Sequence, residues 1–195
     1  MLVSASEFSS ILKHFGRDGN ILSEILKKSW DGKDLHILTR KEPLSVPSPH
    51  LSLVGEVTLE ELKRRIRDTE LYNGFANRMM WLIVKRSKKL PHGGNLDLSS
   101  VSTEIKELKK AIEFASTVGE IELSESAHEV WVGLYDILSD EIPGVFGAVT
   151  SRSEPMVIRL AMIYALADCS KLIEVRHLMI AYNYLWQRYE SCTRE

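Results

Sequence analysis

Cysteine is scarce in this chain of 195 residues. Only Cys169 and Cys192 occur, and they are not arranged with C-x-x-C spacing. Two such thiols exclude a disulfide-stabilised secreted scaffold and a cysteine-rich zinc site, and they suit a protein of the reducing cytoplasm. The six histidines form no H-x-x-x-H or H-E-x-x-H pair, so the sequence predicts no metal site.

Long apolar runs and charge of one sign are also missing. No stretch reaches 18 apolar residues and no basic segment precedes an apolar core at the N-terminus, so we expect neither a membrane span nor a secretory signal. Lys and Arg number 25 against 27 Asp and Glu, a net charge of -2. Any contact with nucleic acid must therefore come from a local basic patch.

Several catalytic motifs do not occur in the sequence. There is no G-x-S-x-G, no G-x-G-x-x-G after a strand and no G-x-x-x-x-G-K-[ST] phosphate-binding loop. The glycine pairs at Gly16 with Gly19 and Gly93 with Gly94 lack the Lys-Ser/Thr that would contact nucleotide phosphates and Mg²⁺. We therefore do not expect this chain to hydrolyse ATP by itself.

The most informative stretch runs from residue 49 to residue 91. Apolar residues between Leu51 and Val57 predict a short strand. Thr58 and Glu61 follow it as the T-x-x-E of a capping box, which predicts a helix over residues 59–68.

A second predicted strand lies in the same stretch. The Asn73-Gly74 pair indicates a turn, and the unbroken apolar run from Met79 to Val84 follows it. Strand, helix, turn and strand in this order predict a βαβ unit of an α/β protein with a mostly parallel sheet.

Three motifs in this stretch carry a family resemblance. They are T-x-x-E-L at residues 58–62, N-G-F-A-N-R at residues 73–78 and R-S-K-K-L-P at residues 86–91. Together they resemble helicase-like P-loop ATPase domains of unknown function that accompany primase/polymerase domains on phage and plasmid replication proteins. The resemblance implies the C-terminal part of a P-loop NTPase fold, with ATP and Mg²⁺ as cofactors of the intact protein and none for this chain alone.

The resemblance implies catalytic roles for Glu7 and Arg78. Glu7-Phe8 matches the E-F that ends an apolar strand in the family, where the acid polarises water or holds Mg²⁺. Ala5 and Ser6 stand where family members often carry further acids, which is a departure from the pattern. Alternatively, Glu7 is a helix N-terminal acid favoured by the macrodipole, because the apolar spacing from Phe8 to Phe15 predicts a helix.

Arg78 and Thr58 each have two interpretations. By the resemblance, Arg78 is an arginine finger that stabilises the transferring phosphoryl group across a subunit interface. Alternatively, it forms a salt bridge with Glu70 or Asp68 that holds the turn. Thr58 is either a sensor of the γ-phosphate or a helix N-cap, and the two roles are compatible.

Two groups of basic residues are candidate nucleic-acid contacts. The first flanks a short predicted strand at residues 35–39 and a proline-rich loop or edge hairpin at residues 41–49, and consists of Lys33, Arg40 and Lys41. The second follows the predicted strand at residues 79–84 and consists of Lys85, Arg86, Lys88 and Lys89. Single-stranded DNA is the expected partner of both groups, and a solvated surface is the alternative.

The second half of the chain has a helical pattern. Apolar spacing predicts helices over residues 99–116, from residue 126 to residue 138, over residues 154–168 and from residue 175 onward, with Ser124 or Ser126 as an N-cap. His177 is predicted to lie on the surface of the last helix.

This half resembles the lid of AAA+ ATPases, through T-S-R-S-E-P-M-V-I-R-L-A at residues 150–161. The resemblance implies that Arg152 or Arg159 contacts the nucleotide. Alternatively, Arg159 extends to the helix surface or pairs with Glu154 or Asp168.

The sequence thus predicts an ATPase core without its P-loop over residues 1–93 and a helical lid over residues 94–195. The expected function is that of a C-terminal fragment of a replication-associated, helicase-like ATPase, completed by an upstream P-loop half or acting as a homo-oligomer. One alternative is a non-enzymatic DNA-binding or assembly module, and another is a degenerate fragment without activity of its own.

Overall fold

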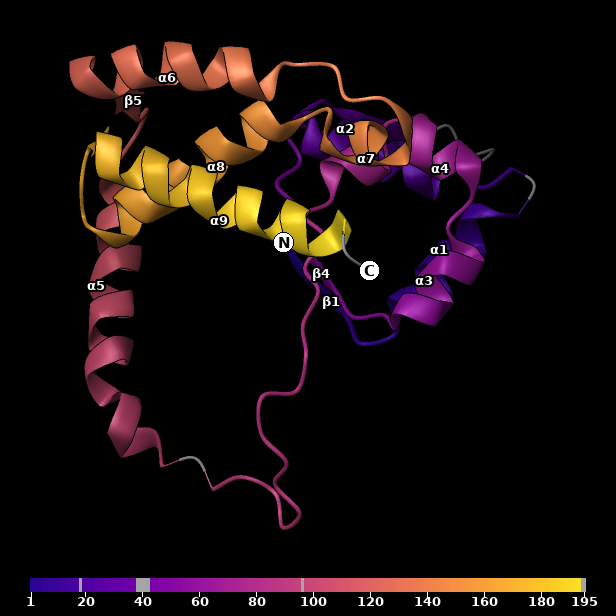
Figure 1. Cartoon of the computed structure of the whole chain (residues 1–195), viewed down its shortest axis with the longest axis horizontal. Coiled ribbons are helices and arrows are strands. Elements are labelled where there is room, and N and C mark those ends of the chain that lie inside the picture. The colour runs from indigo at the N-terminus through magenta and orange to yellow at the C-terminus, as the bar shows by residue number, and fades with distance from the viewer. Residues whose placement is uncertain (18, 38–42, 96, 194–195) are drawn as a thin grey trace. The chain divides into compact units, whose positions relative to one another are not determined.

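The computed structural model describes residues 1–17, 19–37, 43–95 and 97–193 (Figure 1). These residues form a mixed α/β structure of two compact units. The first unit comprises Met1–Met79 and Ile142–Ser151, and the second comprises Met80–Glu141 and Arg152–Glu195.

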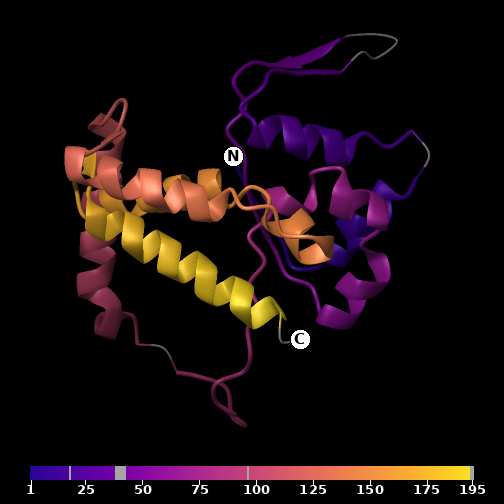
Figure 2. The same cartoon turned by 45° about the horizontal axis from the view of Figure 1, so that its top comes forward.

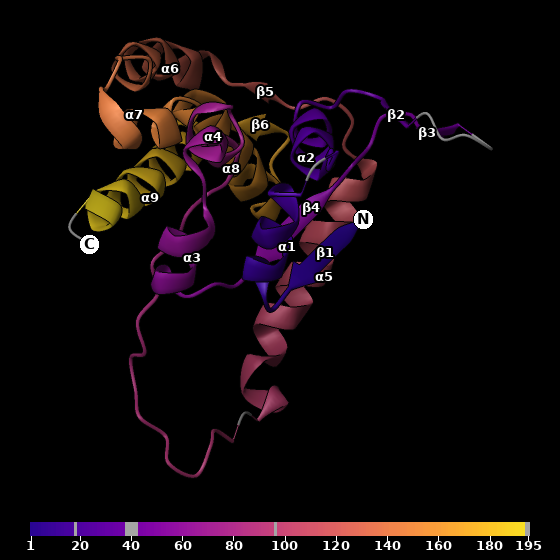
Figure 3. The same cartoon turned by 90° about the vertical axis from the view of Figure 1, so that its right-hand side faces the viewer.

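A small parallel sheet organises the first unit. Strand β1 (Leu2–Ala5) pairs with β4 (Ser52–Gly55), so that Leu2 lies opposite Ser52 and Ala5 opposite Gly55. Helix α1 (Phe8–Phe15) follows β1 and helix α3 (Leu59–Arg65) follows β4, and the two helices pack together (Figure 3). A Cβ on Gly55 would lie 2.6 Å from a ring carbon of Phe8, so only glycine allows this approach.

The remaining elements of the first unit are short. Helix α2 (Leu22–Trp30) is followed by Gly32, whose φ of 68° is left-handed, and the Lys33 N–H donates to the Lys28 carbonyl in a Schellman motif. The predicted edge hairpin is confirmed by β2 (Leu35–Ile37) and β3 (Leu44–Val46), which pair antiparallel. The other elements are α4 (Asp68–Tyr72), the 3₁₀ helix η1 (Ala76–Arg78) and α7 (Gly144–Thr150).

The predicted strand at residues 79–84 is wrong. The segment from Met80 to Leu90 has no regular secondary structure, and Leu82 and Val84 are exposed. A strand needs a neighbour that satisfies its backbone N–H and C=O groups, and an apolar run alone does not supply one. In the first unit, parallel pairing forms instead between β1 and β4, which are separated by 46 residues of chain, Ser6 to Leu51.

The second unit is mainly helical, as predicted (Figure 2). The 3₁₀ helix η2 (Leu98–Val101) leads into α5 (Ser102–Thr117), and α6 (Glu125–Leu138), α8 (Ser153–Ala167) and α9 (Val175–Thr193) follow. Two-residue strands β5 (Glu122–Leu123) and β6 (Leu172–Ile173) pair in parallel and precede α6 and α9.

The core of the second unit lies between α8 and α9. Its fully buried side chains are mostly small or aliphatic, which lets the two helices approach closely. They include Val157, Ala161, Ala165, Leu178 and Ala181.

Candidate functional site

Glu7 and Thr58 lie at the carboxyl ends of neighbouring parallel strands. Beyond the last paired residues, the Glu56 N–H donates to the Ala5 carbonyl and the Phe8 N–H donates to the Glu56 carbonyl, both at 2.9 Å. These bonds hold the two chain exits in register, and both Glu7 and Thr58 are exposed. We call this place the β1–β4 edge, and the carboxyl ends of strands are where open α/β sheets bind their ligands.

Thr58 is confirmed as the N-cap of α3. Its Oγ1 accepts a hydrogen bond from the Glu61 N–H at 3.2 Å. A threonine hydroxyl carries one proton as well as its acceptor lone pairs, so capping leaves this proton to donate to a second group. The capping role is therefore compatible with contact to a phosphate oxygen.

Glu61, in the first turn of α3, forms an ion pair with Arg65 on the same helix. Arg65 Nε donates to Glu61 Oε2 at 2.8 Å, four residues apart on the helix. The pKa of Glu61 is lowered, chiefly by this hydrogen bond and further by a hydrogen bond from Ser9 on α1. The Glu61 carboxylate therefore stays ionised at neutral pH, and its hydrogen bonds go to Arg65 on α3 and Ser9 on α1.

Glu7 occupies the N-cap position of α1. Its side chain makes no capping hydrogen bond, whereas its carbonyl accepts from the Ser10 N–H and the Ser10 hydroxyl. The predicted helix from Phe8 to Phe15 is confirmed. A carboxylate at a helix N-terminus is favoured electrostatically, so both interpretations of Glu7 remain, and its catalytic role stays a prediction.

The N-G-F-A-N-R motif forms a packed turn rather than an exposed loop. Asn73 Oδ1 accepts from the Phe75 N–H at 2.9 Å, and Gly74 has a φ of 86° that favours glycine. Phe75 and Ala76 are fully buried, and the Phe75 ring meets the Phe15 ring edge-on at 4.8 Å. Asn77 Nδ2 donates to the Ser151 hydroxyl at the end of α7.

Arg78 closes this turn through a salt bridge, although the predicted partners Glu70 and Asp68 are wrong. Its Nε and Nη2 contact Asp31 Oδ1 and Oδ2 at 3.1 and 3.0 Å, and Nη1 donates to the Gly74 carbonyl. The guanidinium also lies over the Trp30 ring, 5.4 Å from its centroid. Glu70 is instead buried, with Oε2 accepting from the Ser23 hydroxyl and Asn73 Nδ2.

The predicted nucleic-acid contacts are distributed over both units. Lys33 is exposed in the first unit, and Arg40 and Lys41 lie outside the described residues. The four basic residues of the second group are all exposed on the segment without secondary structure in the second unit: Lys85, Arg86, Lys88 and Lys89.

Arg152 is the N-cap of α8, and Arg159 lies near the middle of this helix. Arg152 is the half-buried residue before the first turn, and Arg159 is exposed seven positions later. Two helical turns separate them, so they lie on the same side of the helix. Of the two partners proposed for Arg159, Glu154 accepts from the Ser139 hydroxyl and Asp168 contacts Arg176 and His177.

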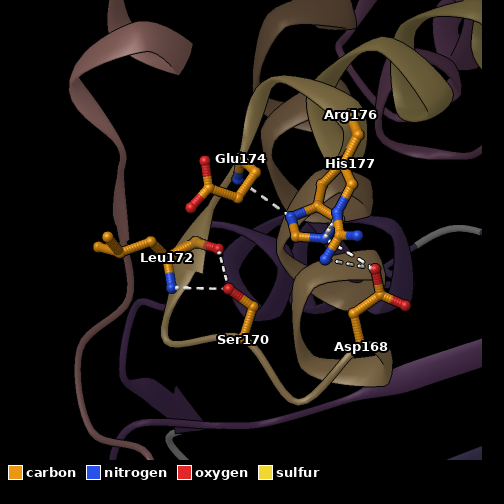
Figure 4. Close-up of polar contacts among 6 residues, drawn as sticks. All are labelled: Asp168, Ser170, Leu172, Glu174, Arg176 and His177. Atoms are coloured by element: carbon orange, nitrogen blue, oxygen red, sulfur yellow. Dashed lines mark hydrogen bonds and ion pairs between the residues drawn. The ribbon is translucent and has the colours of Figure 1, made fainter.

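His177 is a buried residue, and the predicted surface position is wrong (Figure 4). Its Nδ1 accepts from the Glu174 N–H at 3.0 Å, so the ring proton lies on Nε2 and donates to Asp168 Oδ2 at 3.0 Å. Histidine here takes the third position of α9, where a capping box places Glu or Gln. The sequence feature that could have predicted this role is the place of His177 at the third residue of a helix that follows the short apolar stretch Leu172–Ile173.

Replacing His177 by alanine should lower the free energy of unfolding by about 2 kcal/mol, because it removes a buried ring and leaves the Glu174 N–H without its acceptor. Chemical denaturation followed by circular dichroism measures this change. His128→Ala, on the exposed side of α6, is the matched control and should change stability by less than about 0.5 kcal/mol. Equal effects of the two substitutions would contradict the structural role of His177.

No protein-family model and no curated protein matches this chain. Within the described ranges, no three His, Cys, Asp or Glu side chains come together as a metal site. No helix of that part of the chain is long and apolar enough to cross a lipid bilayer.

Proposed function

We propose that the chain supplies part of the active site of a helicase-like ATPase that acts in replication. The observation that supports this most is the β1–β4 edge, which brings Glu7 and Thr58 together although 50 residues lie between them in the sequence, Phe8 to Val57. An exposed carboxylate and an exposed hydroxyl at the carboxyl ends of two paired parallel strands suit nucleotide phosphates and their metal ion.

Each residue of the edge has a distinct role in this proposal. The Glu7 carboxylate accepts a proton from, and orients, the water that attacks the γ-phosphate. The Thr58 hydroxyl donates to a γ-phosphate oxygen while its lone pair caps α3. As an alternative to acting on water, the Glu7 carboxylate would hold Mg²⁺ together with ATP, because this ion is usually bound by one or two carboxylates and substrate phosphates.

Arginine and lysine residues outside the β1–β4 edge contact the nucleotide or DNA in this proposal. Arg78 acts as an arginine finger only if its guanidinium leaves Asp31 and the Gly74 carbonyl. Arg152 and Arg159 lie on one side of α8 and contact nucleotide from the lid. The exposed basic residues between Lys85 and Lys89 bind the phosphates of single-stranded DNA.

The phosphate-binding loop must come from outside these 195 residues, because the sequence contains no G-x-x-x-x-G-K-[ST]. In this proposal, a polypeptide encoded directly upstream supplies the phosphate-binding loop. Assembly of the two parts then creates the complete nucleotide site.

ATP hydrolysis by the purified chain, alone and mixed with the P-loop polypeptide, tests this proposal. We expect no hydrolysis by either part alone, hydrolysis in the mixture and further stimulation by single-stranded DNA. An inactive mixture whose two parts bind each other would overturn the proposal. DNA binding by the chain without any response to nucleotide would then favour a non-enzymatic DNA-binding module.

A further inference from the structure

Helix α5 and the turn before it carry an exposed apolar stripe. Its residues are spaced three and four apart in alternation and are Leu98, Val101, Ile105, Leu108 and Ile112. Leu98, Leu108 and Ile112 are 66%, 61% and 60% exposed, and Ile105 is 40% exposed. We call these five residues the α5 seam, and alternating spacing of three and four is the pattern of a coiled coil.

Most of the seam lies N-terminal to the part of α5 that packs within the second unit, where Ala115 continues the same stripe. Ala111 is buried, and Phe114 and Ala115 are half-buried, near the C-terminal end where α5 contacts α8. Every residue from Ser102 to Lys110 is exposed. Figures 1 and 2 show this N-terminal half of α5 extending beyond the other helices of its unit.

We propose that the α5 seam binds the same seam of a second copy of this chain, as a short parallel two-helix coiled coil. In heptad notation, Ile105 and Ile112 take a positions and Leu108 takes a d position on α5, and Leu98 and Val101 continue the spacing on the 3₁₀ helix η2. Branched Ile at a combined with Leu at d favours two parallel strands over higher oligomers.

Charge complementarity supports a second copy in parallel orientation as the partner. Glu104 takes a g position and Lys109 the e position of the next heptad. In a parallel pair, residue g of one helix faces this e residue of the other. Glu104 of each copy therefore meets Lys109 of the other copy, which gives two such pairs in the dimer. An antiparallel pair would instead place Glu104 near Ala111 and lose both attractions.

The α-helical part of the seam, Ile105 to Ile112, covers only about one heptad, so the association is weak and depends on concentration. Helices this short do not form stable coiled coils when they must also fold on binding. Here the C-terminal part of α5 is already packed on α8, which lowers the ordering cost of association.

Sedimentation velocity of the full chain at concentrations from about 5 to 500 μM tests whether the seam mediates dimerisation. This concentration range suits small, transient interfaces. We expect the weight-average mass to rise toward that of a dimer, and Leu108→Lys to abolish the rise. Val132→Lys is the matched control, because Val132 is 53% exposed on α6, outside the seam, and the variant should still dimerise. A wild-type chain that stays monomeric throughout would overturn the proposal, and so would equal losses in both variants.

Charge reversal and cross-linking test the orientation. Glu104→Lys should weaken dimerisation, and the double variant Glu104→Lys/Lys109→Glu should restore it. In a background with Cys169→Ser and Cys192→Ser, Leu108→Cys should form an intermolecular disulfide, whereas Lys110→Cys on the outer side of α5 should not. A double variant as weak as Glu104→Lys, or equal cross-linking of the two cysteine variants, would contradict a parallel seam.

Discussion

Replacing Arg78 by alanine should lower the free energy of unfolding by about 3 kcal/mol. The Arg78 side chain is only 9% exposed and contacts both carboxylate oxygens of Asp31. Its loss leaves the partly buried Asp31 carboxylate without this cation and the Gly74 carbonyl without its donor. Chemical denaturation of the full chain measures the change.

Three further variants make this experiment specific. Arg64→Ala, an exposed arginine on α3, should change stability by less than about 0.5 kcal/mol. Arg78→Lys should remain clearly destabilised, since an ammonium group does not form the two parallel bonds of a guanidinium. Combining Arg78→Ala with Asp31→Ala should cost less than the sum of the two single changes, because they remove the same interaction. Additive costs would show that the Arg78–Asp31 bridge contributes little.

This bridge also constrains the proposed arginine finger. A finger must reach another subunit, whereas Arg78 here connects the end of α2 with the N-G-F-A-N-R turn inside its own unit. A loss of ATPase activity in Arg78→Ala is therefore informative only beside a stability measurement. A variant that folds at the assay temperature and still loses activity would support the finger.

Local signals in the sequence predicted the helices well. The T-x-x-E capping box at Thr58 to Glu61 places the start of α3, and Ser124 caps α6 by accepting from the Ala127 N–H. The apolar pattern from residue 154 to residue 168 corresponds to α8. These features depend on residues within about four positions of each other, which is the range that a local pattern describes.

Contacts between residues far apart in the sequence could not be predicted from such local patterns. Arg78 pairs with Asp31, 47 positions away, instead of the nearby acids Glu70 and Asp68. The run at residues 79–84 has strand character, but it pairs with no strand among the residues that the structure describes, and a local pattern does not show whether a partner exists. The sequence also did not show the partner of His177, because Asp168 lies nine positions away, before β6.

The candidate site was predicted residue by residue, but its assembly was not. Glu7 and Thr58 were assigned from separate motifs, and the predicted sheet paired residues 51–57 with residues 79–84. The β1–β4 register brings the two residues to one edge. Their proximity is therefore a result of the structure, and their chemical roles are a proposal.

Glu7→Gln should reduce kcat for ATP hydrolysis by the assembled protein by about 10²- to 10⁴-fold, the usual contribution of a positioned general base. Glutamine keeps the shape of the side chain and can still occupy the start of α1, so we expect the fold to be retained. The amide has no negative charge with which to take a proton from water. The effect should therefore appear mainly in kcat, with a smaller change in KM.

The most direct test of the β1–β4 edge is steady-state ATP hydrolysis by the chain mixed with its P-loop polypeptide, comparing wild type, Glu7→Gln and Glu60→Gln. Glu60 is an exposed acid in the first turn of α3, only two residues from Thr58, and serves as the matched control. The proposal predicts a loss of at least about 10²-fold in kcat for Glu7→Gln and wild-type activity for Glu60→Gln. Wild-type kcat in a folded Glu7→Gln variant would contradict the catalytic role of this edge.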